Sequence, residues 1–498
     1  MNKPIRNLAV ACLVLFLALL VNVNYVQFVQ ADDLNSKEGN RRVNDEQFSR
    51  DRGPILVAGE PIALSVDSDD QYKYQRTYPK GELYAHVTGY FSYDYGRGPI
   101  DGNGDGPVEY AENAVLSGSD DRLFVNRVVD LLSNKQHAGG SVELTLDPLA
   151  QKTAAEGLAA LGKKTTGAVA AINPQTGEIL AMVSQPSYDP NQLASHDFAA
   201  VREAITALND DEDKPLLNRA TQQILPPGST FKLVTAAAAL ENDVVDGPGD
   251  EVKGGRSLSF PGMTYQLVNE NGSSCGGDPI SFTRALSVSC NVSFGDLAGK
   301  IGQDDLAEQA AKFGFGADLL AGLPYNASHF TLDDEQLEPN LLAQSGIGQY
   351  NVAATPLQMA VVAGGIANHG EVMVPYLIKT VRSPSYTVLE QAEPKTFSQA
   401  MSRRHADILR DMMVDVVRSG TATSARINGV EVGGKTGTAQ STQDRPPYAW
   451  FVAFAPADDP AVAVAVVIES SDTARNEIAG GRLAGPIAKS VMEAVLSR

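Results

Sequence analysis

The first candidate for chemistry is a serine that lies one helical turn before a lysine. The segment Ser229-Thr230-Phe231-Lys232 follows a Pro-Pro-Gly loop and begins a predicted helix that continues through Leu240. A serine hydroxyl is a weak nucleophile unless a nearby base accepts its proton. Because residues i and i+3 share a helix face, the Lys232 amine can lie over the Ser229 hydroxyl. Burial and a neighbouring cation would favour the neutral amine, and the helix N-terminus would direct backbone N–H groups at a developing oxyanion.

Two further segments strengthen this weak signal, which a helix-capping serine and a surface lysine would also produce. Ser289-Cys290-Asn291 lies 60 residues after Ser229, and Lys435-Thr436-Gly437-Thr438 lies 146 residues after Ser289. Taken singly, they are typical of an ordinary turn and a glycine-bounded strand. Their order, with the first motif at a helix start and the last just before two strands, makes the set a strong indication of a nucleophilic serine.

The elements that must position these residues follow from the apolar pattern. Gly167–Ile172 and Glu178–Ser184 are predicted to form a hairpin around an Asn-Pro-Gln-Thr-Gly turn. Trp450–Ala455 and Ala461–Ile468 are predicted as a second pair of buried strands, followed by a helix over Ala484–Leu496. Strands from both ends of this region, with helical sequence between them, predict an α+β fold with a mainly antiparallel sheet covered by helices.

The preceding region differs in composition and in its pattern of apolar residues, which places a domain boundary near residue 150. Residues 32–140 are polar, rich in Gly, Asp and Tyr, and typical of short strands and turns. Ser141–Leu146 alternates like a strand, and Asp147-Pro148 is typical of a helix N-cap followed by proline. We therefore predict a smaller strand-rich domain over residues 32–150 and a second domain over residues 160–498.

Composition excludes several classes of protein. The 498 residues are 43% hydrophobic and 20% charged, which predicts a folded chain of more than one domain. Forty Lys+Arg against 60 Asp+Glu give a net charge of −20, so binding to nucleic acid is not expected. Three cysteines and six scattered histidines show no metal-binding spacing, so neither a metal nor a cofactor is predicted.

The N-terminus predicts export of the rest of the chain. Lys3 and Arg6 precede an uncharged stretch over residues 8–29, which at about 1.5 Å per residue can cross the hydrocarbon core of a membrane. We predict a cytoplasmic tail at residues 1–7, a single-pass anchor at 8–29 and an extracytoplasmic remainder. A cleaved signal peptide is the alternative, because Val29-Gln30-Ala31 is similar to a cleavage site.

Longer segments around the motifs resemble the transpeptidase domain of class B penicillin-binding proteins. They are GAVAAINPQTGEILAMVSQPSYDPN (167–191), NRATQQILPPGSTFK (218–232) and SGIGQYNVAATPLQMA (345–360). Residues 50–55 resemble the start of the membrane-proximal pedestal, or dimerisation-like, domain of that class. The likeness spans nearly the whole chain, is greatest to the short penicillin-binding protein A type, and implies a penicilloyl-serine transferase fold, as in β-lactamases.

The resemblance also implies a mechanism. Ser229 would attack the carbonyl between the two terminal D-alanines of a peptidoglycan stem peptide, and Lys232 would take its proton. Backbone N–H groups of Ser229 and Thr438 would form the oxyanion hole. Ser289 would relay a proton to the departing D-alanine.

The remaining motif residues are implied to bind substrate. The Asn291 amide would hold the acyl-donor peptide. Lys435, Thr436, Gly437 and Thr438 form the segment that would receive the terminal carboxylate, for which a cation and hydroxyl donors are suited. An amine from a neighbouring stem would then attack the acyl-enzyme and form the crosslink in the cell wall. β-Lactams, which are similar to D-Ala-D-Ala, would acylate Ser229 and leave slowly.

The resemblance further implies a partner in the membrane. Class B enzymes crosslink strands made by a polytopic glycosyltransferase of the shape, elongation, division and sporulation family, which they contact through the anchor and pedestal. The sequence does not distinguish a septal from a polar or lateral role in growth and division.

Two features lie outside the family pattern. Cys290 could form a disulfide with Cys275, closing a loop of about 15 residues worth about 3 kcal/mol, or both could be buried thiols. Asp101, Asn103, Asp105 and Glu112 follow the spacing of a calcium-binding loop, but Gly98-Pro99 precludes the usual entering helix, and ordinary Asp/Gly turns are common.

Three other kinds of protein could contain the same motifs: a hydrolase, a β-lactam sensor and an inactive scaffold. A β-lactamase or D,D-carboxypeptidase would pass the acyl group to water, for which Glu338 in Glu338-Pro339-Asn340 is the nearest candidate activating residue. A β-lactam sensor would need more membrane spans and a cytoplasmic output domain. An inactive scaffold would have no reason to keep all the motif residues together.

Overall fold

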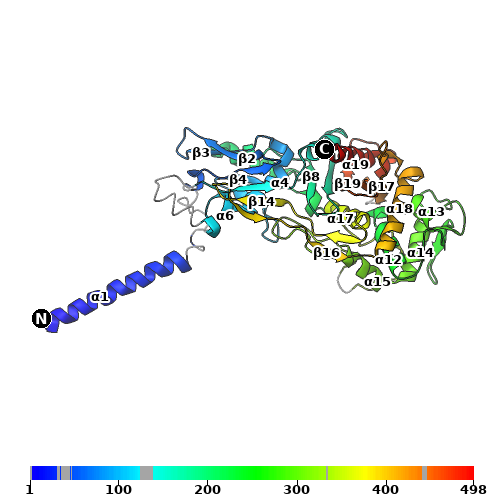
Figure 1. Ribbon diagram of the computed structural model, residues 1–498, viewed down its shortest axis with the longest axis horizontal. Coiled ribbons are helices and arrows are strands. Elements are labelled where there is room, and N and C mark those ends of the chain that lie inside the picture. The colour runs from blue at the N-terminus through cyan, green and yellow to red at the C-terminus, as the bar shows by residue number, and fades with distance from the viewer. Residues whose placement is uncertain are drawn as a thin grey trace.

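A long N-terminal helix extends away from the body of the molecule (Figure 1). α1 spans Lys3–Asn24 and continues into the helical turn η1, Tyr25–Val29, and α1 has no buried residue. Of the helices described, the one that begins at Lys3 is alone in being long and apolar enough to span a membrane, which fits the predicted anchor. The alternative cleavage site ends at Ala31, outside the described residues. The computed structural model describes residues 3–30, 34, 45, 47–123, 138–332, 335–439 and 446–497.

A six-stranded sheet, in the order β15-β14-β6-β1-β2-β3, forms the part of the body nearer to α1. β1 (Ile55–Val57) pairs in parallel with β6 (Ser141–Leu144), whereas the other neighbours are antiparallel. β14 (Ile378–Arg382) and β15 (Val388–Gln391) come from the range predicted as the second domain, so this sheet draws strands from both predicted domains. The other elements here are β2 Glu60–Asp67, β3 Tyr74–Thr77, η2 Gly81–Tyr84, α4 Ala85–Thr88, β4 Tyr90–Ser92, β5 Gly96–Gly98, α5 Val108–Ala111, α6 Asn113–Leu116 and η3 Asp121–Leu123.

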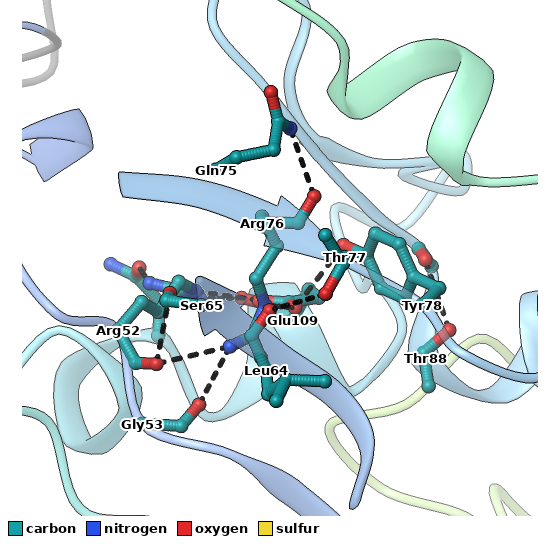
Figure 2. A network of polar contacts seen from close by, with 12 residues as sticks. Arg52, Gly53, Leu64, Ser65, Gln75, Arg76, Thr77, Tyr78, Thr88 and Glu109 are labelled. Atoms are coloured by element: carbon teal, nitrogen blue, oxygen red, sulfur yellow. Dashed lines mark hydrogen bonds and ion pairs between the residues drawn. The ribbon is translucent and has the colours of Figure 1, made fainter. Parts of the chain in front are cut away.

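A buried ion cluster holds this region together (Figure 2). Arg52 Nε and Arg76 Nε donate to the two carboxylate oxygens of Glu109 at 2.6 and 2.7 Å, and the Tyr78 hydroxyl donates to the same carboxylate at 3.2 Å. Glu109 is fully buried, and the two arginines are 3% and 2% exposed. Burial alone would raise the pKa of Glu109, but the charges of Arg76 and Arg52 lower it below its usual value.

Replacing Glu109 by glutamine is expected to destabilise the protein by about 3–5 kcal/mol, because two buried guanidinium groups would lose their counter-charge. Glu431→Gln is the matched control, since Glu431 pairs with Arg418 at 2.9 Å on the surface and should contribute at most about 1 kcal/mol. Chemical denaturation of both variants measures the difference. Equal losses would contradict a structural role for the buried cluster.

A five-stranded antiparallel sheet, β17-β18-β19-β7-β8, forms the centre of the other half of the body. β7 (Thr166–Ile172) and β8 (Ile179–Gln185) are the predicted hairpin, and β18 (Tyr448–Ala455) and β19 (Val462–Ser470) are the predicted second pair. β17 (Gly433–Ala439) is an edge strand and contains the Lys-Thr-Gly-Thr motif. Nearly every residue of the other four strands is buried, which explains why their sequences are continuous apolar runs.

Helices cover both faces of this sheet. Gly364 of α17 lies against Ala463, whereas Gly485 of α19 lies against the ring of Phe451. Ala463 pairs with Phe454, and Phe454 lies an odd number of residues from Phe451, so the two helices cover opposite faces. The predicted α+β fold is therefore confirmed. The helices are α8 Pro148–Ala159, α9 Asn191–Ala194, α10 Phe198–Asp210, α11 Arg219–Gln222, α12 Lys232–Glu241, α13 Phe282–Ser287, α14 Asn291–Ile301, α15 Gln303–Lys312, α16 Pro339–Ser345, α17 Pro356–Ala367, α18 Arg403–Ser419 and α19 Gly480–Leu496.

Two of these helices test the sequence-based boundaries. α8 begins as predicted, because the Asp147 carboxylate accepts a hydrogen bond from the Ala150 N–H at 2.7 Å. α19 begins at Gly480, four residues before the predicted start. A Cβ on Gly480 would lie 2.0 Å from the Trp450 carbonyl oxygen and 2.5 Å from that of Gly437, so the first turn needs glycine to approach the sheet. The short elements of this half are η4 Gly228–Thr230, β9 Glu251–Val252, β10 Ser257–Ser259, β11 Gln266–Val268, β12 Ile280–Ser281, β13 Glu371–Met373, β16 Thr396–Gln399, η5 Thr423–Ala425 and η6 Arg475–Glu477.

Candidate active site

Ser229 lies in the 3₁₀ turn η4, which directly precedes α12. The Gly228 N–H donates to the Gly348 carbonyl at 2.9 Å, which fixes the turn from one side. Gly228 has a φ of +54°, and a Cβ there would lie 3.0 Å from the Thr438 carbonyl oxygen. Glycine therefore allows the nucleophile turn to pack against the edge strand β17. The structure thus brings Ser229 next to the Lys-Thr-Gly-Thr motif.

Lys232 is the first residue of α12 and is fully buried. Its Nζ donates to the Ser289 carbonyl and to Asn291 Oδ1, both at 2.7 Å, and lies 3.3 Å from Ser289 Oγ. Among the described residues, no hydrogen bond joins Lys232 Nζ to Ser229 Oγ, the contact expected from helix geometry. The reason is that Ser229 lies outside α12, and stronger acceptors on the Ser-Cys-Asn segment hold the amine.

Ser289 links the two lysines of the motifs. Lys435 Nζ donates to Ser289 Oγ at 2.8 Å and to the Thr436 carbonyl at 2.9 Å. Ser289 has a φ of +59°, an uncommon conformation for a residue other than glycine, which is often found at functional sites. This turn between α13 and α14 presents both the carbonyl and the hydroxyl of Ser289 to Lys232.

Burial shifts the protonation of both lysines. Burial and the positive charge of Lys435 lower the pKa of Lys232 far below its usual value, although the charge of Glu270 opposes this. Burial lowers the pKa of Lys435 to about 7, again opposed by Glu270. The predicted neutral Lys232 beside a cation is therefore consistent with the surroundings of both amines.

Hydrogen-bond capacity shows how a proton can move through this cluster. A neutral Lys232 amine has two hydrogens, and the two oxygens at 2.7 Å can accept both. Its lone pair is then free to accept a proton, and Ser289 Oγ, which accepts from Lys435, lies 3.3 Å from the amine nitrogen. Ser289 therefore provides a route for a proton between Lys232 and Lys435.

Asn291 has both ends of its amide engaged. Its Oδ1 accepts from Lys232, and its Nδ2 donates to the Val268 carbonyl at 3.0 Å. The second Nδ2 hydrogen is available to a substrate carbonyl. In this structure Asn291 positions the lysine amine, a role that the sequence did not predict for it.

The Cys275–Cys290 pair forms a disulfide with a Cα–Cα distance of 5.9 Å, so the disulfide alternative is confirmed. Cys290 lies between Ser289 and Asn291, so the bond ties the loop that ends at Cys275 to the active-site turn.

The calcium alternative has no such support. Asp101 Oδ1 accepts the N–H groups of Asn103 and Asp105 at 2.9 Å, an ordinary turn, and the described residues contain no cluster of three His, Cys, Asp or Glu ligands.

The edge strand holds the remaining predicted residues. Thr436 and Thr438 are half-buried, and a Cβ on Gly437 would lie 2.9 Å from the Pro227 carbonyl oxygen, so Gly437 permits close approach of the nucleophile loop. Thr421, which sequence analysis missed, lies with its hydroxyl 2.8 Å from that of Thr436. No sequence signal identifies Thr421, because it precedes the motif by 14 residues in an irregular segment.

Comparisons with known proteins agree with the motifs and with the geometry of the site. The family model of the penicillin binding protein transpeptidase domain matches residues 167–493, and that of the penicillin binding protein A dimerisation domain matches residues 52–142. The first match covers more than half of the chain. This protein therefore belongs to the penicillin-binding protein family with a transpeptidase domain.

Within that family, the chain is similar to proteins named PbpA. It is 40% identical to the peptidoglycan D,D-transpeptidase PbpA of Mycolicibacterium smegmatis, over 100% of this chain and 99% of the relative. The PbpA of Mycobacterium tuberculosis is 36% identical with the same coverage. The solved penicillin-binding protein A of M. tuberculosis, as a ceftriaxone acyl-enzyme, has a TM-score of 0.83 at 36% identity, over 91% of this chain and 100% of that chain. The penicillin G acyl-enzyme of that protein has a TM-score of 0.82 at 36% identity, over 90% and 100%. The resemblance predicted from the motifs is confirmed.

Proposed function

We propose that this protein is a peptidoglycan D,D-transpeptidase, which crosslinks stem peptides through an acyl-enzyme on Ser229 and is acylated there by β-lactams. The observation that carries the proposal is the Ser289 hydroxyl held between two buried lysines, beside the turn that contains Ser229. Such a cluster can take a proton from a nucleophile and return it to a leaving group. The names of the PbpA relatives and the β-lactam acyl-enzymes among the solved structures support the same chemistry.

Acylation begins when Ser229 Oγ attacks the carbonyl carbon between the two terminal D-alanines. Lys232 accepts the hydroxyl proton, and the N–H groups of Ser229 and Thr438 hold the oxyanion that forms. Collapse of this intermediate breaks the C–N bond. The proton then passes from Lys232 through Ser289 to the nitrogen of the leaving D-alanine, and Ser229 remains as an ester.

The terminal carboxylate of the donor peptide binds along β17. Lys435 supplies a positive charge, and the hydroxyls of Thr436 and Thr438 supply hydrogen bonds. The Thr421 hydroxyl, which lies 2.8 Å from that of Thr436, holds the Thr436 hydroxyl in place. Asn291 uses its remaining amide hydrogen for a carbonyl of the donor peptide.

Deacylation transfers the acyl group to an amine. A neutral amine of a second stem attacks the Ser229 ester, forms the crosslinking amide and restores the serine hydroxyl. Transfer to water, as in a β-lactamase, would need a carboxylate that reaches the ester. Glu338 is exposed where it precedes α16 and, among the described residues, has no hydrogen bond to Ser229 or Lys232. This favours the amine over water as the acceptor.

Acylation is expected to have a bell-shaped dependence on pH. Lys232 must be neutral to accept the proton, so the rate rises with pH through its lowered pKa. Lys435 must be charged to hold the carboxylate, so the rate falls as the pH rises through a pKa of about 7. The second-order rate constant for penicillin acylation, measured from about pH 5 to about pH 9, tests this. A rate that climbs throughout would contradict a charged Lys435. Lys435→Gln should acylate slowly at every pH and lose the falling limb, and its rising limb should move to higher pH because the charge that lowers the pKa of Lys232 is gone.

The proposed function is tested by the lifetime of the covalent adduct. Purified full-length protein in detergent is incubated with a fluorescent penicillin, and the adduct is located by peptide mapping and followed with time. A long-lived ester on the peptide that contains Ser229 is expected. Rapid loss of the label by hydrolysis would indicate a β-lactamase, and no labelling would indicate an inactive scaffold.

We also propose that the helix from Lys3 is an uncleaved anchor, with residues 1–7 cytoplasmic and the catalytic domain outside the membrane. The basic residues before the apolar stretch support this orientation. A polytopic glycosyltransferase of the shape, elongation, division and sporulation family is the proposed partner, contacted through the anchor and the residue 32–150 domain. Crosslinking to neighbouring membrane proteins from positions in the anchor tests both proposals.

A further inference from the structure

A carboxylate on the loop that borders the active site has no partner among the residues that the structure describes. Glu270 is exposed and, among the described residues, makes no hydrogen bond or ion pair. We propose that Glu270 binds a primary ammonium group of the stem peptide and so makes the enzyme selective for cationic stems. This inference rests on the proposed transpeptidase function and specifies the charge of its substrate.

The position of Glu270 is fixed by its neighbours in the chain. The Val268 carbonyl accepts from Asn291 Nδ2 at 3.0 Å, and Asn269 Oδ1 accepts from the Val292 N–H at 3.1 Å. Glu270 therefore follows two residues that are both bonded to the start of α14. The disulfide described above ties the far end of the same loop to the residue before Asn291. These contacts hold Glu270 on the Asn291 side of the site, where the donor peptide is proposed to bind.

Asn269 makes this segment rigid. Its Nδ2 donates to the Gly255 carbonyl at 2.9 Å and to the Ser273 carbonyl at 2.8 Å, and the residue is only 6% exposed. The backbone on both sides of Glu270 is thus held by a buried side chain, whereas the Glu270 carboxylate is left in solvent. A fixed backbone with a free charge is suited to recognition of a ligand, because little order must be imposed on binding.

In the free enzyme, the charge of Glu270 opposes the neutral form of the base Lys232, whereas it favours the charged form of Lys435. It raises the pKa of both Lys232 and Lys435, and no other described carboxylate shifts either one. The charges that act on Lys232 are those of Lys435 from β17 and Glu270 from this loop, and the uncharged groups that contact its amine are Ser289 and Asn291. An ammonium bound at Glu270 would cancel its charge, so the pKa of Lys232 would fall when substrate is in place. Binding of the correct stem would therefore favour the neutral base.

The stem peptides that take part in crosslinking carry the ammonium group. Each crosslink requires a stem with a side-chain amine, and stems of one kind serve as both donor and acceptor. A donor stem therefore carries a free amine that is protonated near neutral pH, and an acceptor carries one before it loses its proton to attack. Either amine could meet Glu270, so the experiment has one arm for each.

The donor arm uses the full-length enzyme in detergent and two D-Ala-D-Ala peptides, one with a free side-chain amine and one acetylated there. Release of D-alanine measures acylation. We expect the wild type to prefer the free amine about fivefold, as for an exposed ion pair, and less at high salt. Glu270→Gln should lose this preference. Glu251→Gln is the control, because Glu251 is exposed on β9, earlier in the same half of the molecule, but does not act on either lysine.

The acceptor arm starts from the acyl-enzyme and measures its partition between water and an amine acceptor. Loss of amine selectivity in Glu270→Gln at this step alone would assign the ammonium to the acceptor, and loss at acylation alone would assign it to the donor. Unchanged selectivity at both steps would overturn the proposal. Penicillin labelling of Glu270→Gln should persist, whereas a wild type that penicillin does not label would reject the transpeptidase function itself.

Discussion

Replacing Ser229 by alanine is expected to abolish covalent labelling by penicillin. The adduct is an ester on the serine oxygen, so removing that oxygen leaves this turn only the Thr230 hydroxyl, which is buried and donates to the Pro227 carbonyl at 2.7 Å. The rate of adduct formation should fall by at least about 1,000-fold, to the background of the assay. Intact mass and gel fluorescence of the full-length variant measure it, and a retained unfolding temperature shows that the fold is intact.

The informative control is Ser289→Ala, because Ser289 is the serine that contacts both lysines in the structure. If Ser229 is the nucleophile, the Ser289 variant acylates slowly, since the proton relay is lost, but the adduct still maps to the peptide containing Ser229. Labelling that survives in Ser229→Ala and disappears in Ser289→Ala would reverse the two roles.

Replacing Lys232 by methionine should lower the acylation rate by about 100-fold to 10,000-fold, the usual contribution of a general base. Methionine has a similar length and suits a buried position, but it cannot accept the Ser229 proton. The Ser289 carbonyl and Asn291 Oδ1 would also lose the donor that lies 2.7 Å from each. Stopped-flow measurement with a chromogenic β-lactam gives the rate for variant and wild type.

A lysine outside the site provides the control for this substitution. Lys253 is exposed and pairs with Asp296 at 2.6 Å on the surface, so Lys253→Met should acylate at the wild-type rate. Lys232→Arg adds a second test, because an arginine keeps the charge but cannot act as a base at any pH of interest. Acylation that persists in Lys232→Arg would show that the positive charge, rather than proton transfer, is the contribution of this residue.

The sheet at the centre of the catalytic half was predictable because its strands are buried on both faces. Continuous apolar runs at 167–172 and 450–455, bounded by turn residues, indicate strands without reference to the rest of the chain. The start of α19 was not predictable in the same way. The helix begins at Gly480 because a residue without a Cβ can lie against the carbonyl oxygens of Trp450 and Gly437, and the composition of one segment carries no information about such distant neighbours.

The sequence also did not predict which strands pair across the two halves of the body. β14 and β15 carry no mark that distinguishes them from other short strands, yet they extend the sheet that begins at residue 55. Strand partners are chosen by the packing of the whole molecule, so a pattern of period two can indicate a strand but cannot identify its neighbour.

The sequence by itself determined which residues are candidates for chemistry, because a serine, two lysines and an asparagine occur in three short motifs in a familiar order. Only the tertiary structure decided what those groups contact. The Lys232 amine is bonded to residues 57 and 59 positions away rather than to Ser229, three positions earlier in the chain. Burial in that packed cluster, and not the motif, lowers the pKa of both amines. The protonation of a side chain depends on the charges and solvent around it in space, which adjacent letters of a sequence do not specify.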